Sequence, residues 1–122
     1  MAKADDLMGL GFPAAQATAI GLTSAAITAA GTTSADATAA NAQNTFLIVT
    51  ATGSDGIRLS SSTPLLTPII VANPSGSNGK VYPHTGGAVN GGSTDAGETI
   101  ATTTVQIWVR YSATAWAAVL GA

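Results

Sequence analysis

His84 is the single imidazole of the chain and the first residue to consider for catalysis or metal binding. A histidine acts as a general base near neutral pH, but it needs an oriented partner and a nucleophile beside it. With one imidazole, a metal site built on several histidines is excluded. His84 stands between Pro83 and Thr85 in a stretch rich in turn residues. We therefore expect a solvated loop histidine without a catalytic role.

Six carboxylates offer the other route to acid–base chemistry. A glycosidase-type pair requires two inward-facing carboxyl groups, one of them with a pKa raised by burial. Asp55 falls in a predicted turn, and Asp95 and Glu98 fall in a glycine-rich loop, where turn formation and solvation account for them. No oxygen ligands at alternating positions surround Asp95 and Glu98, as a Ca²⁺ loop would require. The sequence therefore predicts no catalytic residue, no metal site and no cofactor.

Trp108 and Trp116 are the remaining candidates for a binding role. They fall on the two strands of a predicted hairpin, so their rings are expected to stack across it. An exposed pair would form a platform for a sugar ring. Because aromatic residues make up only 5% of the chain, packing in the core or at a subunit interface is the preferred interpretation.

Short strands separated by turns are predicted for the second half of the chain. Residues 45–52 are β-branched and apolar on both faces, which is typical of a strand covered on two sides. Alternation over 105–111, followed by residues 115–120, predicts an antiparallel hairpin. Further short strands are expected at residues 57–60, 69–72 and 80–83. The spacing predicts a mainly β fold, a small antiparallel β-sandwich or barrel.

The first third of the chain is different. Residues 5–21 predict two short helical pieces, with Asp5 or Asp6 as the first cap and Pro13 at the start of the second. Helices this short must dock on another surface to be stable. Residues 22–43 are almost wholly Ala, Thr, Ser and Gly without helical or strand periodicity. We therefore expect a helical or extended arm at residues 1–43 and a β domain at residues 44–122.

Composition narrows the classes of function. The 122 residues include 25 Ala, 18 Thr, 14 Gly and 10 Ser, and the net charge is −2. Four basic residues cannot form a stripe for phosphates, so no nucleic-acid partner is expected. Few large apolar side chains predict a thin core, and 8% charged residues predict a poorly solvated surface. Both features favour a homo-oligomer that forms part of a larger assembly.

The N-terminus does not predict targeting or membrane insertion. Two acids, Asp5 and Asp6, stand where a secretory signal carries basic charge. The mildly apolar residues 7–30 are interrupted by glycines, a proline and hydroxyl residues, so they do not predict a membrane span. We expect no membrane partner.

Several segments of the chain resemble one family of proteins. They are Asp5–Ala17, Asn73–Gly76, Val81–Gly91, Trp108–Ser112 and Trp116. Together they resemble small structural proteins of tailed bacteriophages that decorate or cement the outside of the capsid. The resemblance implies a β-rich trimer at local threefold positions of the major capsid protein lattice. Residues 22–43 match no pattern of this group.

The predicted function is that of a non-enzymatic virion structural protein. It would be a capsid decoration or cement protein on the capsid exterior, made in the bacterial cytoplasm, which stabilises the head and is a homotrimer. The large apolar groups of the arm and the two tryptophans are the predicted interface residues: Leu7, Leu10, Phe12, Trp108 and Trp116. Two alternatives stay open: a head fibre or tail/baseplate subunit, and a carbohydrate-binding β module that uses Trp108 and Trp116.

Overall fold

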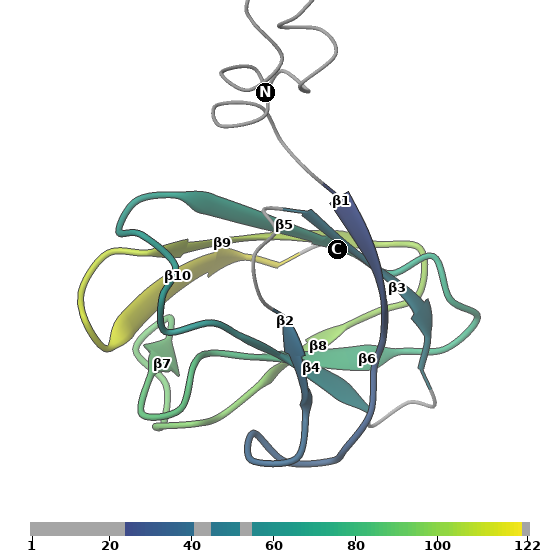
Figure 1. Cartoon of the computed structure of the whole chain (residues 1–122), viewed down its shortest axis with the longest axis horizontal. Helices are drawn as coiled ribbons and strands as arrows, with labels where there is room; N and C mark the ends of the chain where they lie inside the picture. Colours follow the sequence, from purple (N-terminus) through teal and green to yellow (C-terminus); the bar gives the residue numbers. More distant parts are fainter. Residues whose placement is uncertain (1–23, 41–44, 52–54, 121–122) are drawn as a thin grey trace, which may run out of the picture.

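A computed structural model describes residues 24–40, 45–51 and 55–120 of the chain (Figure 1). These residues form strands, turns and loops, and they contain no helix long and apolar enough to cross a membrane. The strands are β1 (Ser24–Thr28), β2 (Thr38–Ala40), β3 (Thr45–Thr50), β4 (Gly56–Leu59), β5 (Pro68–Ala72), β6 (Gly79–Tyr82), β7 (Ala88–Val89), β8 (Glu98–Ile100), β9 (Val105–Arg110) and β10 (Ala115–Val119).

The strands form two sheets that lie over one another as two layers (Figure 1). One sheet has six strands in the order β1-β3-β5-β9-β10-β7, and the other has four in the order β2-β4-β6-β8. The mainly β prediction is confirmed, and the architecture is sandwich-like. The predicted helical arm at residues 5–21 lies outside the described residues.

The expectation of antiparallel sheets was wrong in part, because both sheets are mixed. Five of the eight strand pairs in the described part of the chain are parallel, and three are antiparallel. The reason is the path of the chain. From β1 to β6 each strand lies in the opposite sheet from the one before it, so β1, β3 and β5 are laid side by side in the same direction. β2, β4 and β6 likewise lie side by side and parallel in the four-stranded sheet.

This winding also changes the domain boundary expected at residue 43. The described residues of the Ala/Thr/Ser-rich segment supply β1 to one sheet and β2 to the other, so they belong to the β fold. Small side chains suit this position, because Ala29 and Ala40 are buried against the core with 2% and 3% exposure. Thr38 donates its hydroxyl to the carbonyl of Thr28, which ties β2 back to β1.

The core lies between the layers. The six-stranded sheet contributes the larger groups, Phe46, Ile48, Ile69, Val71, Trp108 and Trp116. The four-stranded sheet contributes Ala40, Ile57, Leu59, Val81 and Ile100. The two indoles supply much of the volume in a chain that has few large apolar residues, so the core depends on them.

The predicted C-terminal hairpin is confirmed. β9 and β10 pair antiparallel, with Val109 opposite Ala117 and Trp108 opposite Ala118. β9 also pairs antiparallel with β5 on its other side. The hairpin is therefore an interior part of the six-stranded sheet, and one of its faces points to the core while the other points away from it.

Candidate functional site

His84 lies in the loop between β6 and β7, as predicted, but it is buried, so the expectation that it is solvated was wrong. Its side chain is 6% exposed. The indole Nε1–H of Trp116 donates to His84 Nδ1 over 2.9 Å, and the ring also has a hydrogen bond to the backbone of Ala113. The partner tryptophan is 32 positions away in the chain, which is why the local sequence gives no sign of it.

The surroundings of His84 favour the neutral imidazole. Burial lowers its pKa, and the positive charge of Arg110 lowers it further. The hydrogen bond to Ala113 and the charge of Asp95 act in the opposite direction but do not outweigh the first two. A neutral ring also suits the contact with Trp116, because a protonated Nδ1 would point a second N–H at the indole N–H.

We expect the free energy of unfolding to fall as the pH is lowered below the ordinary histidine pKa of 6.5. Below that value the unfolded chain binds a proton that the folded chain resists, so stability is complete above it and is lost toward the lower folded-state pKa. Since the chain has one histidine, this window belongs to His84. Urea unfolding at a series of pH values between about 7.5 and 5 measures the loss.

The matched control is His84→Gln, whose amide oxygen can accept from Trp116 but does not titrate. This variant should be less stable near neutral pH yet show a flatter pH profile. Equal slopes for both proteins would show that His84 does not govern the acid side of the stability curve.

Trp108 and Trp116 are both 0% exposed, so neither ring offers a surface to a subunit or a sugar. Their centroids lie 6.1 Å apart at 69°, an edge-to-face contact across the hairpin. Trp108 Nε1 donates to the amide oxygen of Gln106 over 3.0 Å, and Gln106 Nε2 donates to the Thr99 carbonyl. Core packing, one of the two expected roles, is what these rings do. Their assignment as interface residues is corrected, because the core encloses them. Leu7, Leu10 and Phe12 lie outside the described residues.

The acidic residues act in the described structure as parts of turns and strands. Asp95 Oδ1 accepts from the Gly86 N–H over 2.7 Å, as the turn interpretation expects. Asp36 accepts from the N–H and hydroxyl of Thr33, and these bonds lower the pKa of Asp36. Glu98 begins β8 and does not lie in a loop. In the described residues, no group of three or more His, Cys, Asp or Glu side chains is placed to hold a metal ion.

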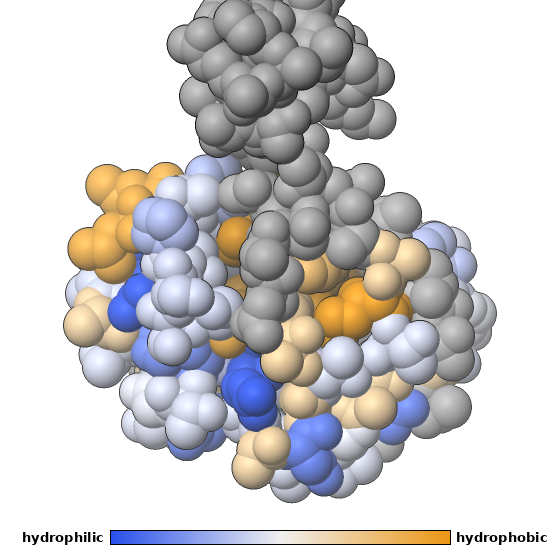
Figure 2. All heavy atoms as spheres, viewed as in Figure 1, coloured by the Kyte–Doolittle hydropathy of each residue, from blue (hydrophilic) through white to orange (hydrophobic). Residues whose placement is uncertain are grey.

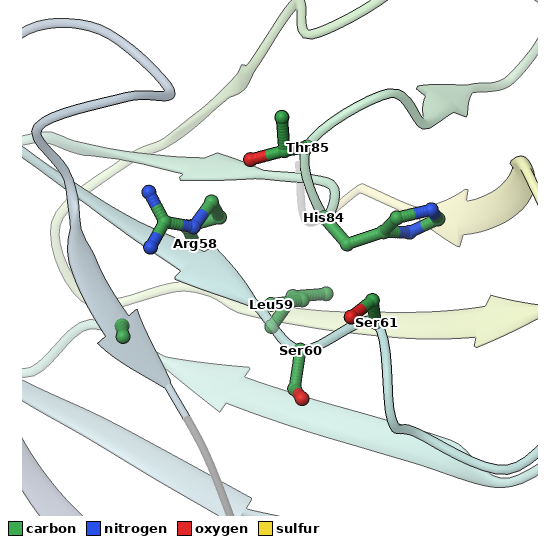
Figure 3. A pocket seen from close by; sticks show the side chains of 7 residues that line it. Arg58, Leu59, Ser60, Ser61, His84 and Thr85 are labelled. Atoms are coloured by element: carbon green, nitrogen blue, oxygen red, sulfur yellow. The ribbon is translucent and has the colours of Figure 1, made fainter.

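One polar hollow of about 230 Å³ lies beside β2 and β4 (Figure 3). It is lined by Ala39, Arg58, Leu59, Ser60, Ser61, His84 and Thr85. Arg58 donates to the carbonyls of Ser34 and Ala35 at 2.7 and 3.2 Å. The His84 ring turns away from Arg58 to its bond with Trp116 (Figure 3). The two ionisable groups of the hollow are thus engaged within the fold.

Among the described residues, the outer face of β5, β9 and β10 forms an apolar surface. Its side chains are all apolar: Pro68, Ile70, Ala72, Val105, Ile107, Val109, Ala115, Ala117 and Val119. We call these nine residues the β5–β9–β10 face. Strand register aligns them in rows, such as Ile70–Ile107–Val119. Val105, Ile107 and Val119 are 50%, 40% and 70% exposed.

The other sheet provides a comparison within the same molecule. Its outward positions carry Ala39, Gly56, Arg58, Lys80, Tyr82 and Thr99; Gly56 and Tyr82 are buried, and the other four, which include two charges, are half-buried or exposed. That composition is typical of a sheet face in contact with water. The β5–β9–β10 face lacks such groups, so it has the composition of a face covered by protein.

Two exposed leucines extend the apolar surface at the end of β9. Leu65 and Leu66 are 54% and 71% exposed in the loop before β5. Figure 2 shows an orange, hydrophobic patch at the upper left of the molecule, on the side where Figure 1 places the start of β5. Leu66 has a positive φ of 63° and donates its N–H to the Arg110 carbonyl over 2.8 Å. The Arg110 guanidinium donates to the carbonyls of Ser61 and Thr63, which holds this loop in place.

Alternation over residues 105–111 indicated two faces for β9, but it did not indicate which one enters the core. The volume of Trp108 accounts for the orientation of β9, because the indole fills more of the space between the sheets than Val105, Ile107 and Val109 on the other face would.

Comparison of the chain with protein families, curated proteins and solved structures gave no match. The function is therefore argued from the residues and their arrangement.

Proposed function

We propose that this chain is a non-enzymatic structural protein of a tailed-phage head. It would be a capsid decoration protein that self-associates and binds the outside of the major capsid protein lattice. The observation that carries this proposal is the β5–β9–β10 face, whose strand residues include no charged or hydroxyl side chain, with the exposed Tyr111 at its edge. The resemblance of its turn and tryptophan segments to decoration proteins supplies the kind of assembly.

The physical demands on such a protein agree with this surface. A cement protein needs contact area, and apolar contacts keep their strength in salt better than surface ion pairs do. In the described structure Arg58, Arg110 and His84 are engaged in bonds to carbonyls or to an indole. Several weak contacts made at once by one oligomer add up to tight binding on a lattice.

The alternatives differ in how far the same surface supports them. A head fibre or a tail/baseplate subunit would use an apolar face equally well, and electron microscopy of labelled particles separates these positions from the capsid exterior. The carbohydrate-binding alternative loses its platform, because Trp108 and Trp116 are fully buried.

Purified protein should bind phage heads that lack their decoration protein and should cosediment with them. Because the proposed contacts are mainly apolar, the bound fraction should change less than about twofold between 0.1 and 0.5 M salt. In solution the protein should elute at a multiple of 11.9 kDa.

Heads that already carry a full set of decoration protein are the control and should bind little. Failure to bind the bare heads, or binding that high salt abolishes, would contradict the proposal.

A further inference from the structure

We propose that the β5–β9–β10 face packs against the same face of a second copy of this chain, about a two-fold axis. This inference rests on the self-association in the proposed function, and it puts pairs of copies in place of the trimer that the resemblance implies, because a single two-fold contact joins copies only in pairs. It names the surface, the partner and the symmetry of the contact.

The area of the face is large enough to supply much of an interface with a second copy of the chain. Three of its side chains, Val105, Ile107 and Val119, keep 40–70% of their surface exposed, and Tyr111 at the end of β9 keeps 54%. With the half-buried members, the face offers on the order of 500 Å² of apolar surface, which approaches the roughly 800 Å² per partner of a standard interface. The leucines of the loop before β5 lie next to the end of β9 and can supply part of the difference.

The chemistry of the face favours a copy of itself. Across a two-fold axis every side chain near the axis meets its own equivalent or a close neighbour, so a charge there would meet a like charge. All nine side chains of the face are apolar, and the row Ile70–Ile107–Val119 runs across three adjacent strands. Two such sheets can pack about 10 Å apart with their strands nearly aligned, as the layers of a sandwich do.

Two other occupants are conceivable, and the experiment separates them. The N-terminal segment enters this sheet at β1, which β3 and β5 separate from β9. The second alternative occupant of the face is a surface of the capsid lattice. Either would cover the face without joining two copies, so neither would give the self-association described here.

The test uses the full chain with Ile107→Glu, and Thr99→Glu as the matched control. Both positions are exposed on a sheet, but Thr99 lies on the outer face of the other layer. Sedimentation over a range of concentrations should show pairs of copies, or assemblies built from pairs, for the parent and the control. Ile107→Glu should weaken the association at least about 100-fold, as a buried unpaired charge does. The near-UV circular dichroism of the buried tryptophans reports whether each variant is folded.

A second measurement does not depend on the charged variant. The chain has no cysteine, so Ile107→Cys introduces a single thiol. A short bis-maleimide should join two copies of this variant at low micromolar concentration, and it should leave Thr99→Cys unlinked. Linking of neither variant, or a parent assembly that Ile107→Glu leaves intact, would overturn the inference. A parent chain that is monomeric would do the same and would point to one of the other occupants.

The two proposals fail separately. A pair that forms through Ile107 but does not bind bare heads would refute the virion role and leave the interface standing. Binding to heads by a chain whose association is insensitive to Ile107→Glu would refute the interface alone.

Discussion

Trp108→Ala is expected to lower the free energy of unfolding by about 3–5 kcal/mol, a large part of the stability of a domain this size. The indole is 0% exposed and contacts Trp116 edge to face, so its removal leaves a cavity between the two sheets. It also leaves the buried amide oxygen of Gln106 without its donor, which adds to the cost. Urea unfolding followed by circular dichroism measures the change.

Leu120→Ala is the matched control, since it removes a large apolar side chain that is 40% exposed and is not part of the proposed interface. Its expected cost is below about 1 kcal/mol, because the side chain does not fill the core. Similar losses in the free energy of unfolding for the two variants would mean that Trp108 stabilises the fold less than its burial indicates.

The dependence on Trp108 shows what the sequence could reveal and what it could not. The strands at residues 45–50, 69–72 and 105–110 were predictable because local alternation and β-branching mark them. The pairing of these strands was not, because the partner of β3 is β1 on one side and β5 on the other, and each lies one full winding of the chain away. Turn residues indicate where a strand ends, but they do not indicate which sheet receives the next one.

The candidate site shows the same limit at the scale of side chains. The turn role of Asp95 was predictable from its neighbours, whereas the burial of His84 depends on Trp116, which the fold brings to it. For the β5–β9–β10 face, the sequence indicated which residues of β9 lie together but not that they point outward. Its residues on β9 were recognised as one face, but only the packing of Trp108 and Gln106 turns that face outward.

The described residues include few large apolar side chains, and these residues leave the outer face of β5, β9 and β10 partly exposed. Here the bulky aromatic groups of the hairpin occupy the interlayer space, and the valines and Ile107 are left on the outside. The same scarcity that makes the core dependent on two tryptophans therefore leaves an apolar face exposed on the described part of the chain.

Asn73→Leu is expected to lower the free energy of unfolding by about 2–4 kcal/mol, because it breaks a buried polar junction between two loops. Asn73 is 1% exposed, and its amide nitrogen donates to the carbonyls of Ser77 and Ile100 at 2.8 and 3.1 Å. Its amide oxygen accepts from the N–H and the hydroxyl of Ser75. Its backbone bonds Thr103 and Thr104, so one residue joins the loop after β5 to the turn between β8 and β9. Leucine has a similar volume but leaves these buried groups without partners.

Asn73→Asp distinguishes a polar junction from simple packing. The introduced carboxylate keeps the acceptor for Ser75 but faces the carbonyl oxygens of Ser77 and Ile100 without a donor. Burial and these carbonyls should raise its pKa, so the destabilisation should be larger at pH 7 than near pH 4, where the acid is protonated and can donate one bond. Asn78→Ala removes a solvent-exposed bond to Thr102 N–H and should cost below about 1 kcal/mol at either pH. A pH-independent loss for Asn73→Asp would show that shape, and not the hydrogen bonds, sets the stability of this junction.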